Sequence, residues 1–460
     1  MSTVHCCEGC FEKQREIDSL KDEIERLKDK LAYQERTARE GFFGSSTPSS
    51  KMPIKANTPE ENQKKKGGAK PGHKGYGRKT VKEEQADEIE EIPVECTCPD
   101  CGVKLENKAV RKRTIIDCEM VKVKKKVYRL PQKKCPRCGR TFKAVIKDAL
   151  PKSLYSNRFL THVATEHYLR GIPLGRLEEQ MGVNHGGLIN AMHRLAGIFS
   201  AVPQGLIKQY RAAAVKHADE TGWRNDGKNG YAWLFADKKM SIYRFAGSRS
   251  AVVPKEIFGG DRLPGVLVVD RYNGYNKMPC EIQYCYAHLL REVQDLEKEL
   301  PDNAEIKAFA NCMAPLLSEA MGLRTIDIGK QEFKHRAGRI KRKILKAVKK
   351  EAKHPGIQRI QDIFRNNAHR LYHWARDRDI PADNNLAERE LRPLVIARKL
   401  SFGSQSDAGA RTREILMTVL QTLKKQSDNP AASFQDVLEK LSVNPATNVF
   451  QALFQNGRKK

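Results

Sequence analysis

The sequence predicts a multidomain protein of the α/β class. The chain has 460 residues, which at about 100 to 200 residues per domain corresponds to roughly two to four folded units. The hydrophobic periodicity changes along the chain from helical to alternating and back, which indicates helical and strand-rich segments in series. Two closely spaced cysteine pairs mark a further small module.

The composition points to a basic protein of the cytoplasm. Lys and Arg number 84 against 56 Asp and Glu, for a net charge of +28. This charge favours nucleic acid as the partner over a ribosome-like basic surface or an anionic membrane. No 18 consecutive residues are apolar, and the N-terminus MSTVHCCEGCFEK lacks the apolar run of a secretory signal. We therefore expect a cytoplasmic protein with no membrane partner, whose cysteines bind metal rather than form disulfides.

Residues 1–40 are predicted to form a coiled-coil helix. Five apolar residues alternate at spacings of three and four: Ile17, Leu20, Ile24, Leu27 and Leu31. The stripe covers only about two heptads, so it predicts weak self-association, with a solvated charged helix as the alternative. Residues 41–89 are rich in Ser, Pro, Gly and Lys, and we expect a disordered basic linker that lies along phosphates.

Residues 90–150 are predicted to form a zinc-binding β module. Cys98 and Cys101 form one CxxC pair, Cys135 and Cys138 form a second, and 33 residues separate the pairs. Two such turns complete a closed four-sulfur site for a structural Zn²⁺ ion, with metal-free thiols as the alternative. Cys96 is a possible substitute ligand. The segment between the pairs includes VKVKKKVYRL (121–130), whose alternation predicts a strand with one basic face.

A second cysteine cluster lies at the N-terminus. It consists of His5, Cys6, Cys7 and Cys10. Its ligands all fall within six residues, so we interpret it as metal-free.

Residues 151–210 are predicted to be helical and to contain a helix-turn-helix. The apolar positions of IPLGRLEEQMGVNHGGLINAMHRL (172–195) fit two short amphipathic helices. Gly182 lies where the turn requires a residue without Cβ, and Asn184 is the expected N-cap of the second helix. Binding of this second helix in the major groove of DNA is the hypothesis, and a plain helical core is the alternative.

Three acidic residues in the C-terminal half carry the chemistry. Asp219 lies in an apolar strand, and Asp270 ends the buried-type strand GVLVVD. Glu388 falls about one turn into a helix that Asp383 or Asn384 caps, and Pro393 is expected to kink or end this helix. Transfer of a phosphodiester requires carboxylates that hold two divalent ions about 4 Å apart, which three such residues can supply.

Seven strings occur in an order that resembles one family. They are HADETGWR, GYAW, SRS, GVLVVDRYNGY, CYAHLLR, DNNLAERELRP and GSQSDAGARTREILMTVLQT. Together they resemble the transposases of the insertion sequence sixty-six family, a bacterial DDE group with a ribonuclease-H-like core. The resemblance covers essentially the whole chain, from the N-terminal zipper helix through the PGHKGYGR linker and the four-cysteine module.

The resemblance implies a fold and a catalytic site. Residues 211–425 would form the ribonuclease-H-like core, with a helical insertion at about 291–380, and residues 426–460 a helical tail. Asp219, Asp270 and Glu388 would bind Mg²⁺ or Mn²⁺, with Glu390 as the alternative third ligand. His288 in CYAHLLR would assist phosphate positioning or serve the structure. The chain departs from the family pattern at two places. It has Arg271 directly after the second aspartate, and Leu290 followed by Arg291 after the AH motif.

The resemblance also implies the function. The expected activity is that of a DNA transposase that binds element ends, cleaves strands and transfers them to target DNA, as a homo-oligomer with accessory transposition proteins in the bacterial nucleoid. Predicted DNA contacts are Asn184, His185, Asn190, Arg194, Lys122, Lys124, Arg137 and Arg392. The alternatives are a DNA-binding regulator derived from a transposase and a structure-specific nuclease on the same core.

Overall fold

The computed structural model describes most of the C-terminal two thirds of the chain. The described residues are 8–40, 84, 123–130, 132–134, 136, 138, 141–143 and 145–454. The chain divides into two compact units, Met1–Met52 with Val127–Lys460, and Pro53–Lys126. The predicted linker, apart from Glu84, and three of the four predicted zinc ligands, Cys98, Cys101 and Cys135, lie outside the described residues. So do Cys96, Lys122, Arg137 and the N-terminal cysteines apart from Cys10.

The first helix confirms a helical N-terminus. Helix α1 covers Glu8–Glu40. The five apolar residues of its stripe expose between 45% and 57% of their surface. A stripe this exposed leaves room for a second helix to pack along it.

The predicted strand at 121–130 is wrong. Residues 123–130 are exposed and form no strand, and Val127 exposes 93% of its surface. The strands lie further along, as an antiparallel pair on either side of the second cysteine turn: β1 (Gln132–Lys134) and β2 (Thr141–Lys143). Alternation alone does not make a strand, because the backbone also requires a neighbour with which to pair.

Four helices precede the sheet, as predicted for residues 151–210. They are α2 (Asn157–Tyr168), α3 (Leu174–Met181), α4 (His185–Ile198) and α5 (Val202–Arg211). Gly182 ends α3 in the left-handed conformation with φ +61°, and Asn184 caps α4 by accepting a hydrogen bond from the Gly187 N–H. The helix pair and its turn therefore have the predicted local chemistry.

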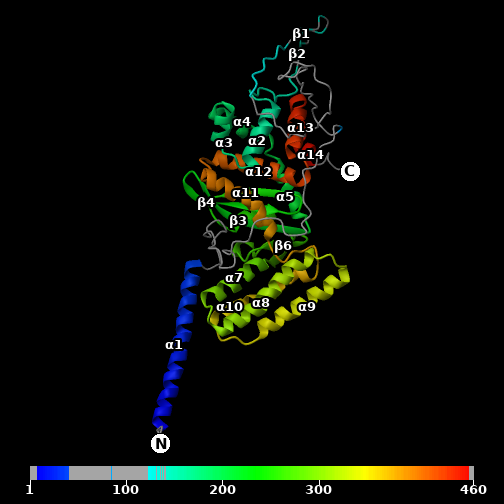
Figure 1. Cartoon of the computed structure of the whole chain (residues 1–460). Coiled ribbons are helices and arrows are strands. Elements are labelled where there is room, and N and C mark those ends of the chain that lie inside the picture. The colour runs from blue at the N-terminus through cyan, green and yellow to red at the C-terminus, as the bar shows by residue number, and fades with distance from the viewer. Residues whose placement is uncertain are drawn as a thin grey trace, which may run out of the picture. The chain divides into compact units, whose positions relative to one another are not determined.

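A mixed five-stranded sheet forms the centre of the first unit (Figure 1). The strands are β3 (Val215–Asn225), β4 (Lys228–Ala236), β5 (Ser241–Ala246), β6 (Val266–Val269) and β7 (Glu281–Tyr284), and α6 (Val252–Phe258) links β5 to β6. Their order is β5-β4-β3-β6-β7. The first three strands form an antiparallel meander, and β6 and β7 extend it in parallel from β3. This mixed sheet confirms the α/β part of the predicted fold class.

The described C-terminal part contains four helices, and the first two of them pack on the sheet. The four helices are α11 (Asn385–Ser401), α12 (Asp407–Gln426), α13 (Pro430–Val443) and α14 (Val449–Phe454). Helix α11 packs on β3 and β4, and α12 packs on β5. Pro393, which was expected to kink or end this helix, lies inside α11 and does not end it, and the buried neighbours Leu391 and Leu394 indicate that packing holds the helix together.

Helix α12 also provides hydrogen-bond acceptors for the edge strand β5 of the sheet. Glu414, Thr418 and Thr422 accept hydrogen bonds from alternate backbone N–H groups of β5, at 3.2, 3.0 and 3.2 Å. The match is geometric, because four residues of helix rise about 6 Å and two residues of strand about 6.6 Å. The string TREILMTVLQT thus protects an edge that would otherwise offer free donors to another chain.

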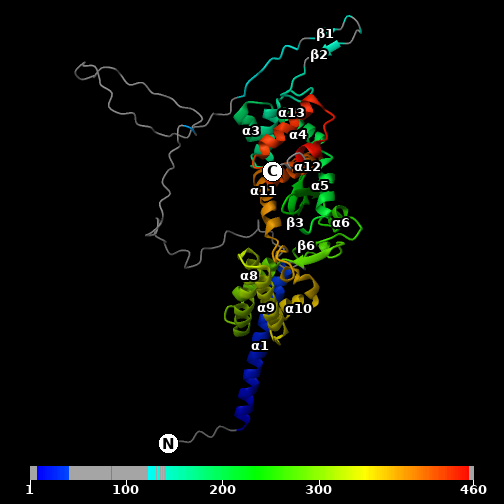
Figure 2. The same cartoon turned by 90° about the vertical axis from the view of Figure 1, so that its right-hand side faces the viewer.

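Four helices form the insertion between the second aspartate and the glutamate. They are α7 (Tyr286–Glu299), α8 (Ala304–Gly322), α9 (Lys330–Lys349) and α10 (Pro355–Asn366). They pack together beside β6, as Figures 1 and 2 show in two views. No helix among the described residues is long and apolar enough to span a membrane.

Candidate active site

The two aspartates lie on neighbouring parallel strands. The register of β3 and β6 pairs His217 with Val268. Asp219 and Asp270 each lie two residues beyond this pair, so both are on the same side of their strands as the paired residues. Asp270 directly follows the last residue of β6, at the carboxyl end, where ligands of α/β sheets bind.

Helix α11 adds the glutamate. Glu388 lies in the first turn of α11. Asn384, just before this helix, donates a hydrogen bond from Nδ2 to the Ala218 carbonyl at 2.8 Å, so the helix begins beside the residue that precedes Asp219. Burial raises the pKa of Asp219 well above its usual value, and the nearby negative charges of Glu220, Asp270 and Glu388 raise it further. The fold therefore gathers four carboxylates from three separate elements.

Backbone N–H groups orient the two aspartates. Asp219 Oδ1 accepts a hydrogen bond from the Glu220 N–H at 2.9 Å, and Asp270 Oδ1 accepts one from the Tyr272 N–H at 3.0 Å. Asp219, Asp270 and Glu388 are all half-buried residues. The two aspartate side chains are thus already held in place by neighbouring backbone N–H groups.

Glu220 forms a second polar cluster with Arg249, Tyr272 and Tyr275. Its side chain is 1% exposed, and Arg249 pairs with its Oε1 at 2.6 Å. Tyr275 donates its hydroxyl to Oε2 at 2.5 Å, and the Arg249 guanidinium stacks on the Tyr272 ring, 4.2 Å from the centroid. Burial and Asp270 raise the pKa of Glu220 to about 7, against the opposing effect of Arg249 and Tyr275.

The sequence contained partial signals for this cluster. The strings SRS and DRYNGY carry Arg249, Tyr272 and Tyr275, but no role for these residues follows from their spacing. Arg271, in the string DRYNGY, pairs with Glu292 of α7. These contacts connect segments that lie far apart in the chain, so only the folded structure reveals them.

The alternative glutamate is engaged elsewhere. Glu390 accepts a hydrogen bond from Ser241 Oγ at 2.8 Å and pairs with Lys425 at 3.4 Å. Glu388 instead acts electrostatically on Asp219 and on His288. Burial lowers the pKa of His288, although Asp270 and Glu388 oppose this shift, and its buried Nδ1 has no hydrogen-bond partner among the described residues.

The donor set suits a hard divalent cation. Within the described residues, no three His, Cys, Asp or Glu side chains lie close enough together to hold a metal ion. The carboxylates are thus close enough to repel one another, but three of them are too far apart to coordinate the same ion. Oxygen ligands of this kind favour Mg²⁺ or Mn²⁺, which would neutralise the repulsion recorded in the pKa of Asp219. Of the predicted zinc ligands only Cys138 is described, as an exposed free thiol.

The predicted DNA contacts that the structure describes come from several segments of the chain. Asn184 caps α4, and His185 Nδ1 lies 3.0 Å from Glu178 of α3. Arg194 is exposed, yet its guanidinium donates to the carbonyls of Pro151 and Lys152, which reduces its freedom to contact a base. Asn190, Lys124 and Arg392 are exposed side chains.

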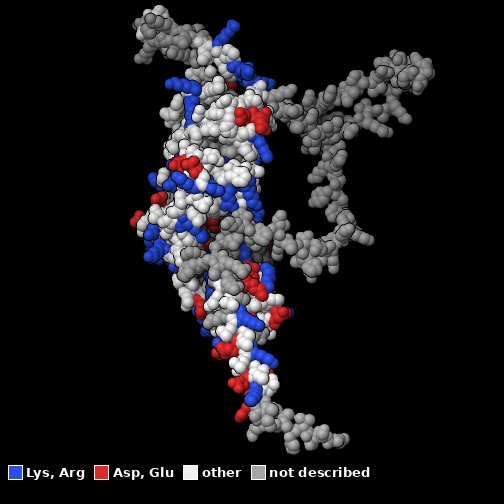
Figure 3. Space-filling view, turned by 90° about the vertical axis from the view of Figure 1, so that its left-hand side faces the viewer, with Lys and Arg blue, Asp and Glu red and all other residues white. Residues whose placement is uncertain are grey.

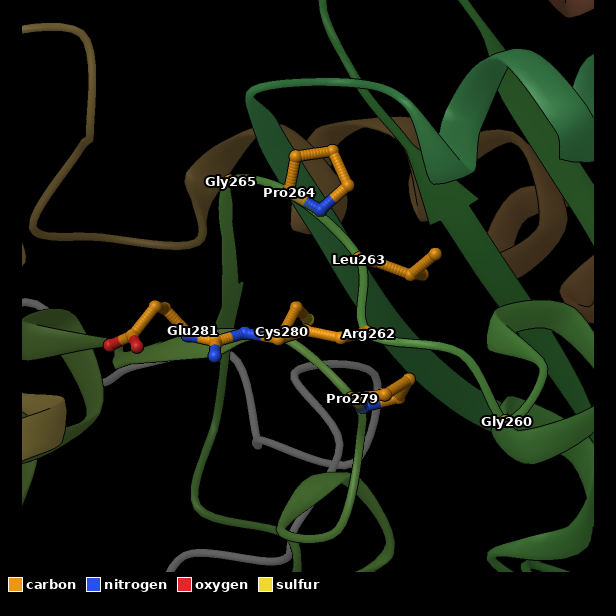
Figure 4. A pocket seen from close by; sticks show the side chains of 8 residues that line it. All are labelled: Gly260, Arg262, Leu263, Pro264, Gly265, Pro279, Cys280 and Glu281. Carbon is orange, nitrogen blue, oxygen red and sulfur yellow. The ribbon is translucent and has the colours of Figure 1, made fainter.

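A pocket of about 460 Å³ lies away from the carboxylates (Figure 4). Its lining comes from the loop before β6 and the start of β7: Gly260, Arg262, Leu263, Pro264, Gly265, Pro279, Cys280 and Glu281. These residues lie at the amino ends of the two strands, whereas Asp270 follows the carboxyl end of β6. This pocket is therefore not the candidate site.

Comparison with known proteins identifies the family. Residues 152–412, more than half of the chain, match the family described as Transposase IS66 family. Two proteins of Sinorhizobium fredii (strain NBRC 101917 / NGR234) are also similar, both named as uncharacterized. The protein y4qI is 24% identical over 347 residues, which are 67% of this chain and 63% of the relative. The protein y4hP is 23% identical over 244 residues, 46% of this chain and 43% of the relative, so the chain covers less than two thirds of either relative. The match over residues 152–412 shows that the chain belongs to the IS66 family of transposases.

Proposed function

We propose that this transposase binds the ends of its element, cleaves DNA strands and joins them to target DNA, with Asp219, Asp270 and Glu388 as the catalytic residues. The observation that carries the proposal is the shared electrostatic environment of the three carboxylates, which come from β3, the end of β6 and α11. The strand order and directions also support the expected ribonuclease-H-like core.

The three residues would hold two Mg²⁺ or Mn²⁺ ions. When bound, such ions activate the attacking oxygen and stabilise the leaving oxygen of the phosphodiester. The chain itself supplies the orientation, since the N–H groups of Glu220 and Tyr272 fix one oxygen of each aspartate. Arg249, half-buried beside the cluster and paired with Glu220, adds a positive charge at the site.

DNA would be held by positive surface on several elements. Figure 3 shows Lys and Arg side chains spread over one face of the molecule. Helix α9 of the insertion buries Phe333, Ile340 and Ile344 and exposes a row of basic side chains: Lys330, Lys334, Arg339, Arg342, Lys343, Lys346 and Lys349. We assign this row, together with the α3–α4 pair, to contacts with DNA, and expect affinity to fall steeply with salt.

Helix α1 would join two copies of the chain. Its exposed stripe places Ile at the a positions Ile17 and Ile24 and Leu at the d positions, a pattern that favours parallel dimers. In a parallel pair, Glu16 and Glu23 at g face Lys21 and Lys28 at e of the partner, with opposite charges. An antiparallel pair would instead bring like charges together. We therefore propose a parallel homodimer through α1.

The activity is tested with purified protein, Mg²⁺ and a labelled element end. We expect cleaved and joined products from the wild type and neither from Asp219→Asn, because the variant loses one metal ligand and keeps the basic surface. Glu390→Gln is the matched control and should retain both products, since Glu390 contacts Ser241 and Lys425. DNA binding by Asp219→Asn should be unchanged in a mobility-shift assay.

Three outcomes would count against the proposal. Equal activity of Asp219→Asn and the wild type would remove the assignment of the site. Cleavage by the wild type without joined product would favour a nuclease. Binding without any cleavage in Mg²⁺ or Mn²⁺ would favour a regulator.

A further inference from the structure

Asn384 is a buried residue whose polar groups are all engaged. It is 1% exposed. Its Nδ2 donates to the Ala218 carbonyl at 2.8 Å, and its Oδ1 lies 2.9 Å from His217 Nδ1. Its backbone N–H donates to Cys285 Sγ at 3.1 Å, and its carbonyl accepts from the Glu388 N–H at 3.3 Å.

His217 sets the orientation of this amide. Because Nδ2 of Asn384 already donates to a carbonyl, Oδ1 is the acceptor and His217 Nδ1 carries the proton. Rotation of the Asn384 amide would break its hydrogen bonds to His217 and to the Ala218 carbonyl. Both partners belong to β3, so this strand fixes the position of the amide.

The contacts of Asn384 reach every element that carries a catalytic carboxylate. Ala218 directly precedes Asp219. The Cys285 N–H donates to the Val269 carbonyl at 2.9 Å, and Val269 directly precedes Asp270. Glu388 lies one helical turn after Asn384. The Asn384 side chain and the Cys285 thiol thus connect the three backbone segments that carry the catalytic carboxylates.

We propose that Asn384 is a positioning residue that sets the separation of the three carboxylates and thereby the affinity of the site for divalent cations. The inference rests on the proposed function, because it needs these carboxylates to be the metal ligands. Residues that orient metal ligands from behind typically change metal affinity by about 10- to 100-fold when they are replaced. Here the effect would pass through the backbone, since Asn384 contacts no carboxylate of the trio directly.

The test is Mn²⁺ binding to the full-length protein without DNA, followed by electron paramagnetic resonance. Asn384→Leu keeps a similar volume and removes the amide, and we expect Mn²⁺ affinity to fall about 10- to 100-fold. Half-saturation of cleavage by Mg²⁺ should shift in the same direction, while DNA affinity stays constant. Gln361→Met is the matched control, because this 2% exposed amide also donates to backbone carbonyls, those of Ala347 and Lys350 in the insertion.

Two variants of Cys285 test the same contact with a smaller change to the buried site, in case Asn384→Leu fails to fold. Cys285→Ala removes the sulfur that accepts from the Asn384 N–H and should weaken Mn²⁺ binding, whereas Cys285→Ser keeps an acceptor and should restore it. A purely structural role would lower thermal stability in the Asn384, Cys285 and Gln361 variants alike and leave Mn²⁺ affinity unchanged.

The outcomes separate this inference from the proposed function. Wild-type Mn²⁺ affinity in Asn384→Leu and Cys285→Ala, with binding lost in Asp219→Asn, would overturn the positioning role and leave the metal site standing. Equal Mn²⁺ binding by the wild type and Asp219→Asn would overturn both.

Discussion

Replacing Glu220 with Gln should flatten the pH dependence of the free energy of unfolding. The Glu220 side chain is 1% exposed, and burial beside Asp270 raises its pKa from 4.5 to about 7. The folded state therefore holds this proton more tightly than the unfolded state between these two pH values. Stability is fully present below pH 4.5 and is lost as the pH rises through 7.

The size of the loss follows from the same pKa. One pKa unit corresponds to about 1.36 kcal/mol, so ionised Glu220 destabilises the fold by roughly 3 kcal/mol. Most of this loss develops between pH 5 and pH 8, where the wild type should lose about 2 kcal/mol through this one group. Glu220→Gln should not show this contribution.

The assay is urea denaturation in the presence of a chelator, at pH 5 and pH 8, for the wild type and Glu220→Gln. Glu390→Gln serves as the control, because its carboxylate pairs with Lys425 rather than with the acidic cluster. We expect the difference in unfolding free energy between the wild type and Glu220→Gln to change by about 2 kcal/mol across this range. A difference that is the same at both pH values would refute the reasoning that Glu220 is a buried carboxyl beside Asp270.

Three further predictions concern other parts of the chain. Burial lowers the pKa of His167 to about 3, so stability should fall below pH 6.5, by about 2 kcal/mol at pH 5, and His167→Gln should remove this loss in denaturation curves. Cys135→Ser should reduce bound zinc, measured by mass spectrometry, and weaken DNA binding; a zinc-free wild type would contradict this. Leu20→Asp with Leu27→Asp should shift the protein from dimer to monomer in light scattering, and an unchanged mass would exclude α1 as the interface.

Local patterns in the sequence predicted much of the architecture. The turn at Gly182 and the cap at Asn184 are both found, because these features depend on the conformational preferences of single residues. Asp270 was expected at the end of a buried strand, and it directly follows β6. The strand expected at 121–130 fails for the opposite reason, since alternation reports one face and cannot report a pairing partner.

Long-range contacts decided what the sequence could not. Glu388 and Glu390 lie two residues apart, and only packing shows that one is near Asp219 while the other contacts Ser241 and Lys425. By itself the sequence determined which residue types were available and where strands and helices would start. The tertiary structure alone decided the junction at Asn384, because its hydrogen bonds join segments about a hundred or more residues apart, and no local periodicity encodes which of them meet.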